Sequence, residues 1–144
     1  MKLPPDQSRD LLGGARVARL ATAGDDGWPH IVPITLALDA DHIYTAVDAK
    51  AKTTTDLKRL RNIRANPRVA VLADHYDEDW AALWWVRADG NASVIEAPDD
   101  MAAPLRLLAA RYPQYSGRAP QGPVISIEVI RWTGWAAQSW PVPE

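Results

Sequence analysis

Two tight turns divide residues 16–47 into three strand-like segments, and this pattern restricts the fold more than any other part of the chain. Gly24–Gly27 carries glycine at positions that tolerate positive φ, and Asp39–Asp41 forms the second turn. The segments run from Arg16 to Ala23, from Trp28 to Leu38 and from His42 to Val47. Short turns join antiparallel neighbours, so the pattern predicts an antiparallel sheet rather than a doubly wound fold.

The middle segment contains two prolines, Pro29 and Pro33. Proline has no N–H to donate to a neighbouring strand, so this segment is expected at a sheet edge or at a bulge. Either position leaves backbone groups free to meet a ligand.

The rest of the chain is expected to add long strands and short helices. Further strands are predicted over residues 68–73, 83–96 and 124–139, with a bulge or tight turn at Asp89–Asn91 and a bend at Gly134. Helices are predicted over residues 8–12, 53–65 and 99–111, with Ser8 capping the first, Gly13 and Gly14 ending it, and Thr53 or Thr54 capping the second. The expected fold class is mainly β (α+β): a six-stranded antiparallel barrel with two or three short helices, in one domain over residues 1–144.

Charge is segregated along the chain. Residues 50–68 carry seven Lys and Arg but a single acid, Asp56, whereas the remainder is acidic and the whole chain has a net charge of −2. A helix start with Lys50, Lys52 and threonine hydroxyls would suit a phosphate. A solvated basic face is the alternative. The acidic remainder and the lack of a nucleic-acid motif argue against nucleic acid as a partner.

Several chemistries lack the residues that they need. The chain has no cysteine, His30, His42 and His75 do not share a metal spacing, and no phosphate-binding loop or nucleophile elbow is present. The longest apolar run is too short to span a membrane, and Met1–Pro5 lacks the apolar region of a signal peptide. We therefore expect a cytoplasmic protein without a metal centre or a membrane partner.

Four segments in succession resemble the pyridoxamine 5′-phosphate oxidase-like split β-barrel superfamily. They are Trp28–Pro33, Ile43–Val47, the Lys/Thr-rich helix and Asn66–Leu72. The later segments Asp74–Trp80, Leu83–Arg87 and Arg131–Trp135 are similar to one actinobacterial branch, the deazaflavin-dependent reductases, whose cofactor is F420. The ending Trp140–Glu144 differs from that of the true oxidase, which argues against pyridoxamine phosphate as the substrate.

The resemblance implies a homodimer with a flavin or deazaflavin site at the subunit interface. The phosphate would lie on the basic segment, with Lys50, Lys52, Thr53 and Arg59 as binding residues; whether Lys50 and Lys52 or Lys58 and Arg59 reach it stays open. The rings would lie along Val32, Pro33, Ile34 and Thr35, and the pocket wall would come from Trp84, Trp85, Trp132 and Trp135.

The implied activity is hydride transfer from reduced F420 to a small conjugated, electrophilic acceptor, with the cofactor carrying the chemistry. No catalytic residue stands out, and Tyr76, His75 and His30 are the candidate proton donors beside bulk water. Two alternatives remain: an FMN-binding protein of the same fold, and a non-catalytic module that binds a flavin or a haem-like ligand.

Overall fold

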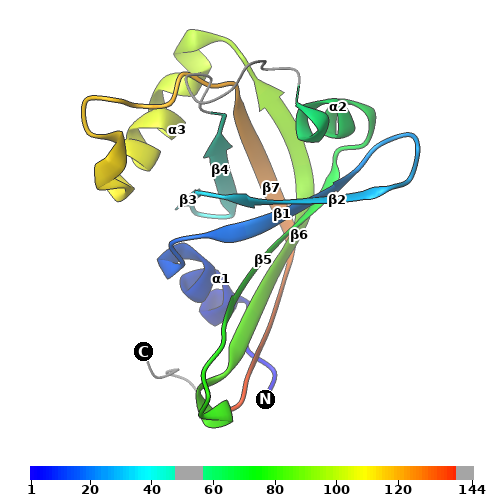
Figure 1. Cartoon of the computed structure of the whole chain (residues 1–144), viewed down its shortest axis with the longest axis vertical. Coiled ribbons are helices and arrows are strands. Elements are labelled where there is room, and N and C mark those ends of the chain that lie inside the picture. Colours follow the sequence, from blue (N-terminus) through cyan, green and yellow to red (C-terminus); the bar gives the residue numbers. More distant parts are fainter. Residues whose placement is uncertain (48–56, 139–144) are drawn as a thin grey trace.

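A seven-stranded antiparallel sheet that curls into a half-barrel forms the centre of the molecule (Figure 1). The computed structural model describes residues 1–47 and 57–138. The strands lie in the order β2-β1-β5-β6-β7-β4-β3. Their bounds are β1 Ala18–Ala23, β2 Pro29–Ile34, β3 Ala37–Asp39, β4 His42–Ala46, β5 Arg68–His75, β6 Trp84–Ile95 and β7 Val124–Ala136.

The seventh strand corrects the expected count of six. Residues 28–38 were expected to form one strand, but the chain leaves β2 after Ile34 and enters β3 at Ala37, at the opposite edge of the sheet. The hydroxyl of Tyr112 holds the break, because it accepts a hydrogen bond from the Leu36 N–H at 2.9 Å. The edge position of β2, predicted from its prolines, is confirmed.

The described residues also form three α-helices and two short 3-10 turns. They are α1 Pro5–Gly14, α2 Lys58–Ala65, η2 Trp80–Ala82, α3 Pro98–Arg111 and η3 Pro113–Tyr115. In Figure 1, α3 lies beside β4, and α2 lies near the end of β1, on the opposite side of the view from α3. No helix among the described residues is long and apolar enough to cross a membrane.

Two predicted helix starts were wrong. Helix α1 begins at Pro5 rather than after a Ser8 cap, because proline suits the first helical position; Ser8 lies buried inside the helix. Helix α2 begins at Lys58, after Leu57 in extended conformation, rather than at Thr53. Thr53 and Thr54 themselves lie outside the described residues.

A bulge interrupts the pairing of β6 with β7, as the Asp89–Asn91 segment predicted. Asp89 pairs with Arg131 and Gly90 with Val129, so Ile130 has no residue opposite it. Gly90 is required there, since a Cβ would lie 2.4 Å from the Glu128 carbonyl oxygen. The face of the sheet that carries Leu20, Val71 and Ile127 forms the core and is called the inner face; the other is the outer face.

Candidate cofactor site

Helix α2 is fixed against the sheet by its apolar face and one buried polar pair. Leu60 and Ile63 are buried in the core, and Asn62 donates a hydrogen bond from Nδ2 to the Thr22 hydroxyl of β1 at 3.0 Å. Asn62 also lies against Gly24, where a Cβ would be 2.5 Å from its Oδ1. These contacts hold the start of α2 beside the β1–β2 turn.

Arg59, in the first turn of α2, is a half-buried cation without a counter-ion among residues 1–47 and 57–138. Its side chain makes no hydrogen bond or ion pair with the part of the chain that the structure describes. Desolvation by burial lowers the pKa of its guanidinium, although arginine stays charged in proteins. No described side chain caps the helix start after Leu57, and the positive end of the helix dipole favours an anion there. The predicted Arg59 thus fits a phosphate.

Lys58, the neighbouring base, already has a partner. Its Nζ lies 3.0 Å from Oδ2 of Asp26, in the β1–β2 turn. The same carboxylate accepts a hydrogen bond from the Trp28 N–H at 3.1 Å. The hydrogen bond from Lys58, and to a smaller extent the one from Trp28, lowers the pKa of Asp26 below its usual value. The predicted residues Lys50, Lys52 and Thr53 lie outside the described residues.

The predicted ring-binding strand is β2 with the residue that follows it. Because β2 ends the sheet, one side of its backbone is unpaired with any described strand. Ile34 is buried, Val32 and Thr35 are half-buried, and Pro33 is exposed on the outer face. The strand therefore keeps the free backbone edge that ring recognition requires, while its side chains divide between the two faces.

The four predicted tryptophans do not lie together. Trp84 and Trp132 pack against the core from the inner face, and Trp132 donates from Nε1 to Asp41 at 3.1 Å. Trp85 and Trp135 pair opposite each other on the outer face. Neighbouring residues of a strand point to opposite faces, which separates Trp84 from Trp85.

The candidate proton donors are also dispersed. His30 lies on β2, pairs with Thr22 and has a buried Nδ1 that makes no hydrogen bond. His75 ends β5, far along the strand from α2, and stacks on Trp84 with 6.2 Å between ring centroids. Tyr76 follows it and is exposed. Of the three, His30 lies nearest in sequence to the predicted ring-binding strand.

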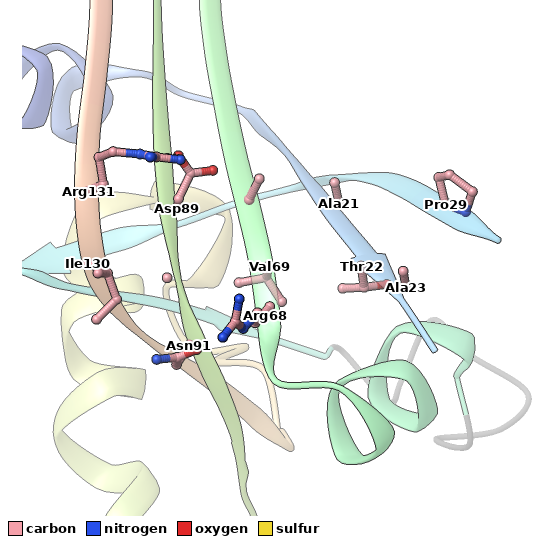
Figure 2. Close-up of a pocket in the computed structure, with 12 residues that line it drawn as sticks. Ala21, Thr22, Ala23, Pro29, Arg68, Val69, Asp89, Asn91, Ile130 and Arg131 are labelled. Atoms are coloured by element: carbon pink, nitrogen blue, oxygen red, sulfur yellow. The ribbon is translucent and has the colours of Figure 1, made fainter. Parts of the chain in front are cut away.

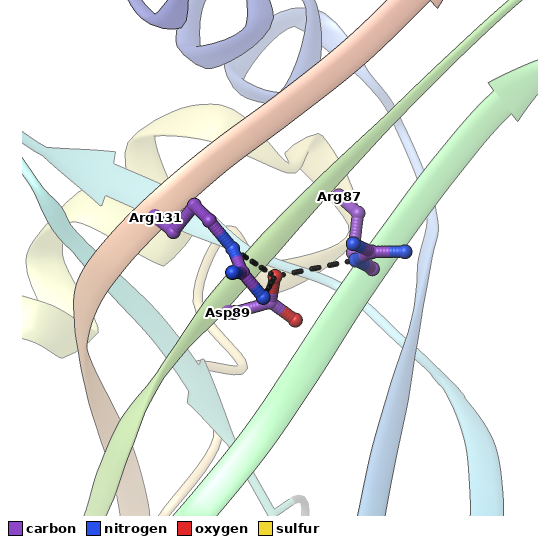
Figure 3. A network of polar contacts seen from close by, with 3 residues as sticks. All are labelled: Arg87, Asp89 and Arg131. Carbon is purple, nitrogen blue, oxygen red and sulfur yellow. Dashed lines mark hydrogen bonds and ion pairs between the residues drawn. The ribbon is translucent and has the colours of Figure 1, made fainter.

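A hollow on the outer face contains none of these predicted residues. It is a groove of about 870 Å³ across β1, β5, β6 and β7, lined by Ala21, Ala70, Arg68, Ile130 and their neighbours (Figure 2). Asp89 at its side accepts hydrogen bonds from Arg87 at 3.3 Å and from Arg131 at 3.2 Å (Figure 3). The alternation of residues along each strand could have predicted which residues lie on this face, but it could not have predicted the groove.

A second cavity, of about 590 Å³, lies where β2 ends. Thr35 lines it with Arg16, Tyr112, Pro113, Gln114 and Tyr115. Tyr112 and Tyr115 were not predicted as site residues, because they reach Thr35 and Leu36 from about 80 residues further along the chain. The only local signal was the tyrosine pair around Pro113.

Residues 1–47 and 57–138 contain no group of three or more His, Asp or Glu side chains placed to hold a metal ion.

Known proteins share this fold. A structure of a conserved hypothetical protein from Mycobacterium tuberculosis superimposes with a TM-score of 0.77 at 22% identity, over 99% of this chain and 90% of the other. An FAD-binding protein from Mesorhizobium loti gives 0.72 at 23% identity, over 93% and 95%. An FAD-binding protein from Mycobacterium smegmatis gives 0.64 at 21% identity, over 94% and 96%. No curated protein matches the chain.

The family comparison covers the whole of the described sheet. The model of the pyridoxamine 5′-phosphate oxidase family matches residues 4–136, from the residue before α1 to the end of β7. The chain therefore belongs to the pyridoxamine 5′-phosphate oxidase family.

Proposed function

We propose that the protein is an F420-dependent oxidoreductase that works as a homodimer and reduces a conjugated, electrophilic small molecule. The observation that carries the cofactor site is Arg59, a half-buried guanidinium without a partner among the described residues at the uncapped start of α2. Such a charge is costly to bury unless an anion compensates it. A cofactor phosphate is the anion that this family membership favours.

Different parts of the proposed site would hold the phosphate and the ring of the cofactor. Arg59 and the start of α2 would hold the phosphate, with Lys50, Lys52 and Thr53 from the preceding segment. The free edge of β2 would orient the ring, and a partner subunit would complete the pocket. Reduced F420 supplies a hydride when bound. The choice of F420 depends on the resemblance of Asp74–Trp80, Leu83–Arg87 and Arg131–Trp135 to the deazaflavin-dependent branch.

A flavin is the second candidate cofactor, and the two FAD-binding proteins of similar fold favour it. The same phosphate site would serve FMN, so the fold does not separate the two.

Side-by-side titration of F420 and FMN, followed by quenching of tryptophan fluorescence, distinguishes them. We expect the wild type to bind F420 more tightly and, once loaded with reduced F420, to reduce an enone such as 2-cyclohexen-1-one. Tighter FMN binding would replace F420 by FMN in the proposal. Tight cofactor binding without reduction of any enone or quinone would favour the non-catalytic module.

The dimer is tested by light scattering of the purified protein. A mass of twice 15.9 kDa is expected. A monomer that binds F420 with full affinity would contradict a site completed by a partner subunit.

A further inference from the structure

The cavity at the end of β2 contains two hydroxyl groups, and one of their O–H bonds is free to donate to a ligand. Oγ1 of Thr35 and Oη of Tyr115 lie 2.9 Å apart and share one hydrogen bond. Neither oxygen has another hydrogen-bond partner in the described chain. Two hydroxyls carry two protons and this bond uses one, so the pair keeps one O–H to donate to a ligand.

The guanidinium of Arg16 lies beside this hydroxyl pair, and no acidic residue lines the described cavity. Arg16 is exposed at the cavity, and the described hydrogen bond of its guanidinium is a long one, 3.4 Å to the Arg111 carbonyl oxygen. The guanidinium of Arg111 lies close by and bonds to the Gly13 and Ala15 carbonyls. None of the described residues that line the cavity is acidic. The cavity therefore offers donors and positive charge to an oxygen acceptor.

Tyr112 fixes the shape of the cavity rather than offering a donor. Its hydroxyl is buried, accepts from the Leu36 N–H and lies 3.0 Å from the Arg16 carbonyl oxygen and 3.1 Å from that of Leu36. Its ring meets that of Tyr115 edge to face at 5.7 Å. The Tyr115 hydroxyl is thus held beside Thr35 by the packing of η3.

We propose that this cavity binds the carbonyl oxygen of the acceptor, with Tyr115, Thr35 and Arg16 stabilising the negative charge that reduction places there. Thr35 directly follows the strand proposed to lie along the cofactor ring. Hydride addition to the β-carbon of an enone moves the C=C electron pair toward the carbonyl oxygen, and a proton from water then completes the α-carbon. Donors already aimed at this oxygen favour the transition state over the neutral acceptor.

Binding of 4-nitrophenol to the full chain without cofactor tests the cavity directly. Its anion resembles the charged oxygen and absorbs at longer wavelength than the neutral phenol. At a pH below the pKa of free 4-nitrophenol, the wild type should bind it as the anion and increase the long-wavelength absorbance. Tyr115→Phe, Thr35→Val and Arg16→Gln should each weaken binding by about tenfold, as for one hydrogen bond to a charged oxygen.

Two matched variants control for general effects. Tyr44→Phe removes a half-buried tyrosine hydroxyl on β4, and Arg106→Gln removes an exposed arginine on α3. Neither residue lines the cavity, so both variants should bind the anion as the wild type does. Wild-type binding that does not favour the anion, or equal affinities for Tyr115→Phe and Tyr44→Phe, would overturn the proposal.

This inference rests on the proposed function for its acceptor, and the two can fail separately. Anion binding that depends on Tyr115, in a protein that reduces no enone with F420 or FMN, would overturn the proposed function and keep the oxyanion site. Enone reduction that Tyr115→Phe leaves unchanged, without anion binding, would overturn the oxyanion site alone. If both hold, Tyr115→Phe should lower kcat/KM for 2-cyclohexen-1-one by about tenfold while F420 affinity stays unchanged.

Discussion

The start of α2 and the outer-face groove both display arginine, but only α2 has a half-buried arginine without an ionic partner among the described residues. In the groove, Asp89 lies between Arg87 and Arg131 and neutralises part of their charge. At α2, Lys58 is paired with Asp26, whereas Arg59 is half-buried without a partner among the described residues. The groove has a volume of about 870 Å³, yet the unpaired half-buried charge at α2 makes the stronger demand for an anion.

The largest expected effect is a loss of stability when Gly90, which lines the groove, is replaced by alanine. Gly90→Ala places a Cβ 2.4 Å from the Glu128 carbonyl oxygen, in the backbone of β7. We expect a loss of about 3 kcal/mol in the free energy of unfolding, measured in urea, because strand backbone must shift. Gly14→Ala, where a Cβ meets nothing within 4 Å, is the control and should change stability little. Equal stabilities of the two variants would contradict the tight bulge.

This bulge shows what local sequence can predict. Gly90 within a long predicted strand indicated it, Pro29 and Pro33 indicated an edge strand, and the apolar spacing of Leu60 and Ile63 indicated the buried face of α2. These features depend on a few adjacent residues, which local patterns describe well.

Features set by distant contacts could not be predicted. The break at Thr35 and Leu36 depends on Tyr112 and Tyr115, about 80 residues away. For the same reason the sequence did not reveal the cavity there. The tryptophans were grouped by residue type, and strand alternation then placed Trp84 and Trp85 on opposite faces.

A smaller effect tests whether the groove takes part in cofactor binding. Asp89→Asn should lower the free energy of unfolding by about 0.5–1 kcal/mol, since its ion pairs are partly exposed. F420 affinity should stay unchanged. Asp25→Asn, in the exposed β1–β2 turn, is the control. A rise of F420 affinity in Asp89→Asn alone, as expected where the carboxylate competes with phosphate for Arg87 and Arg131, would move the phosphate site from α2 to the groove.

The smallest effect concerns Asp26, whose carboxyl pKa is lowered first by the Lys58 hydrogen bond and next by the Trp28 N–H. A lowered pKa in the folded state means that this contribution to stability is present above the ordinary carboxyl pKa. It is lost as the pH falls through the lowered value. Asp26→Asn should flatten this acid part of the stability curve measured by thermal unfolding.

The same Asp26→Asn variant frees Lys58 beside Arg59. We expect F420 affinity to rise slightly at low salt and to return to the wild-type value at high salt, because salt screens an exposed charge. Weaker F420 binding at low salt would show that the Asp26–Lys58 pair itself is needed to shape the site.

The most direct test of the account compares two arginines of α2. Arg59→Gln removes the half-buried charge, whereas Arg64→Gln removes a charge that is already paired with Glu96 at 2.8 Å on the surface. Titration with F420 should show affinity about 10 to 100 times weaker for Arg59→Gln, the loss expected for a charged hydrogen bond to phosphate. Arg64→Gln should bind as the wild type does. Equal affinities for the two variants would contradict the assignment of the cofactor phosphate to the start of α2.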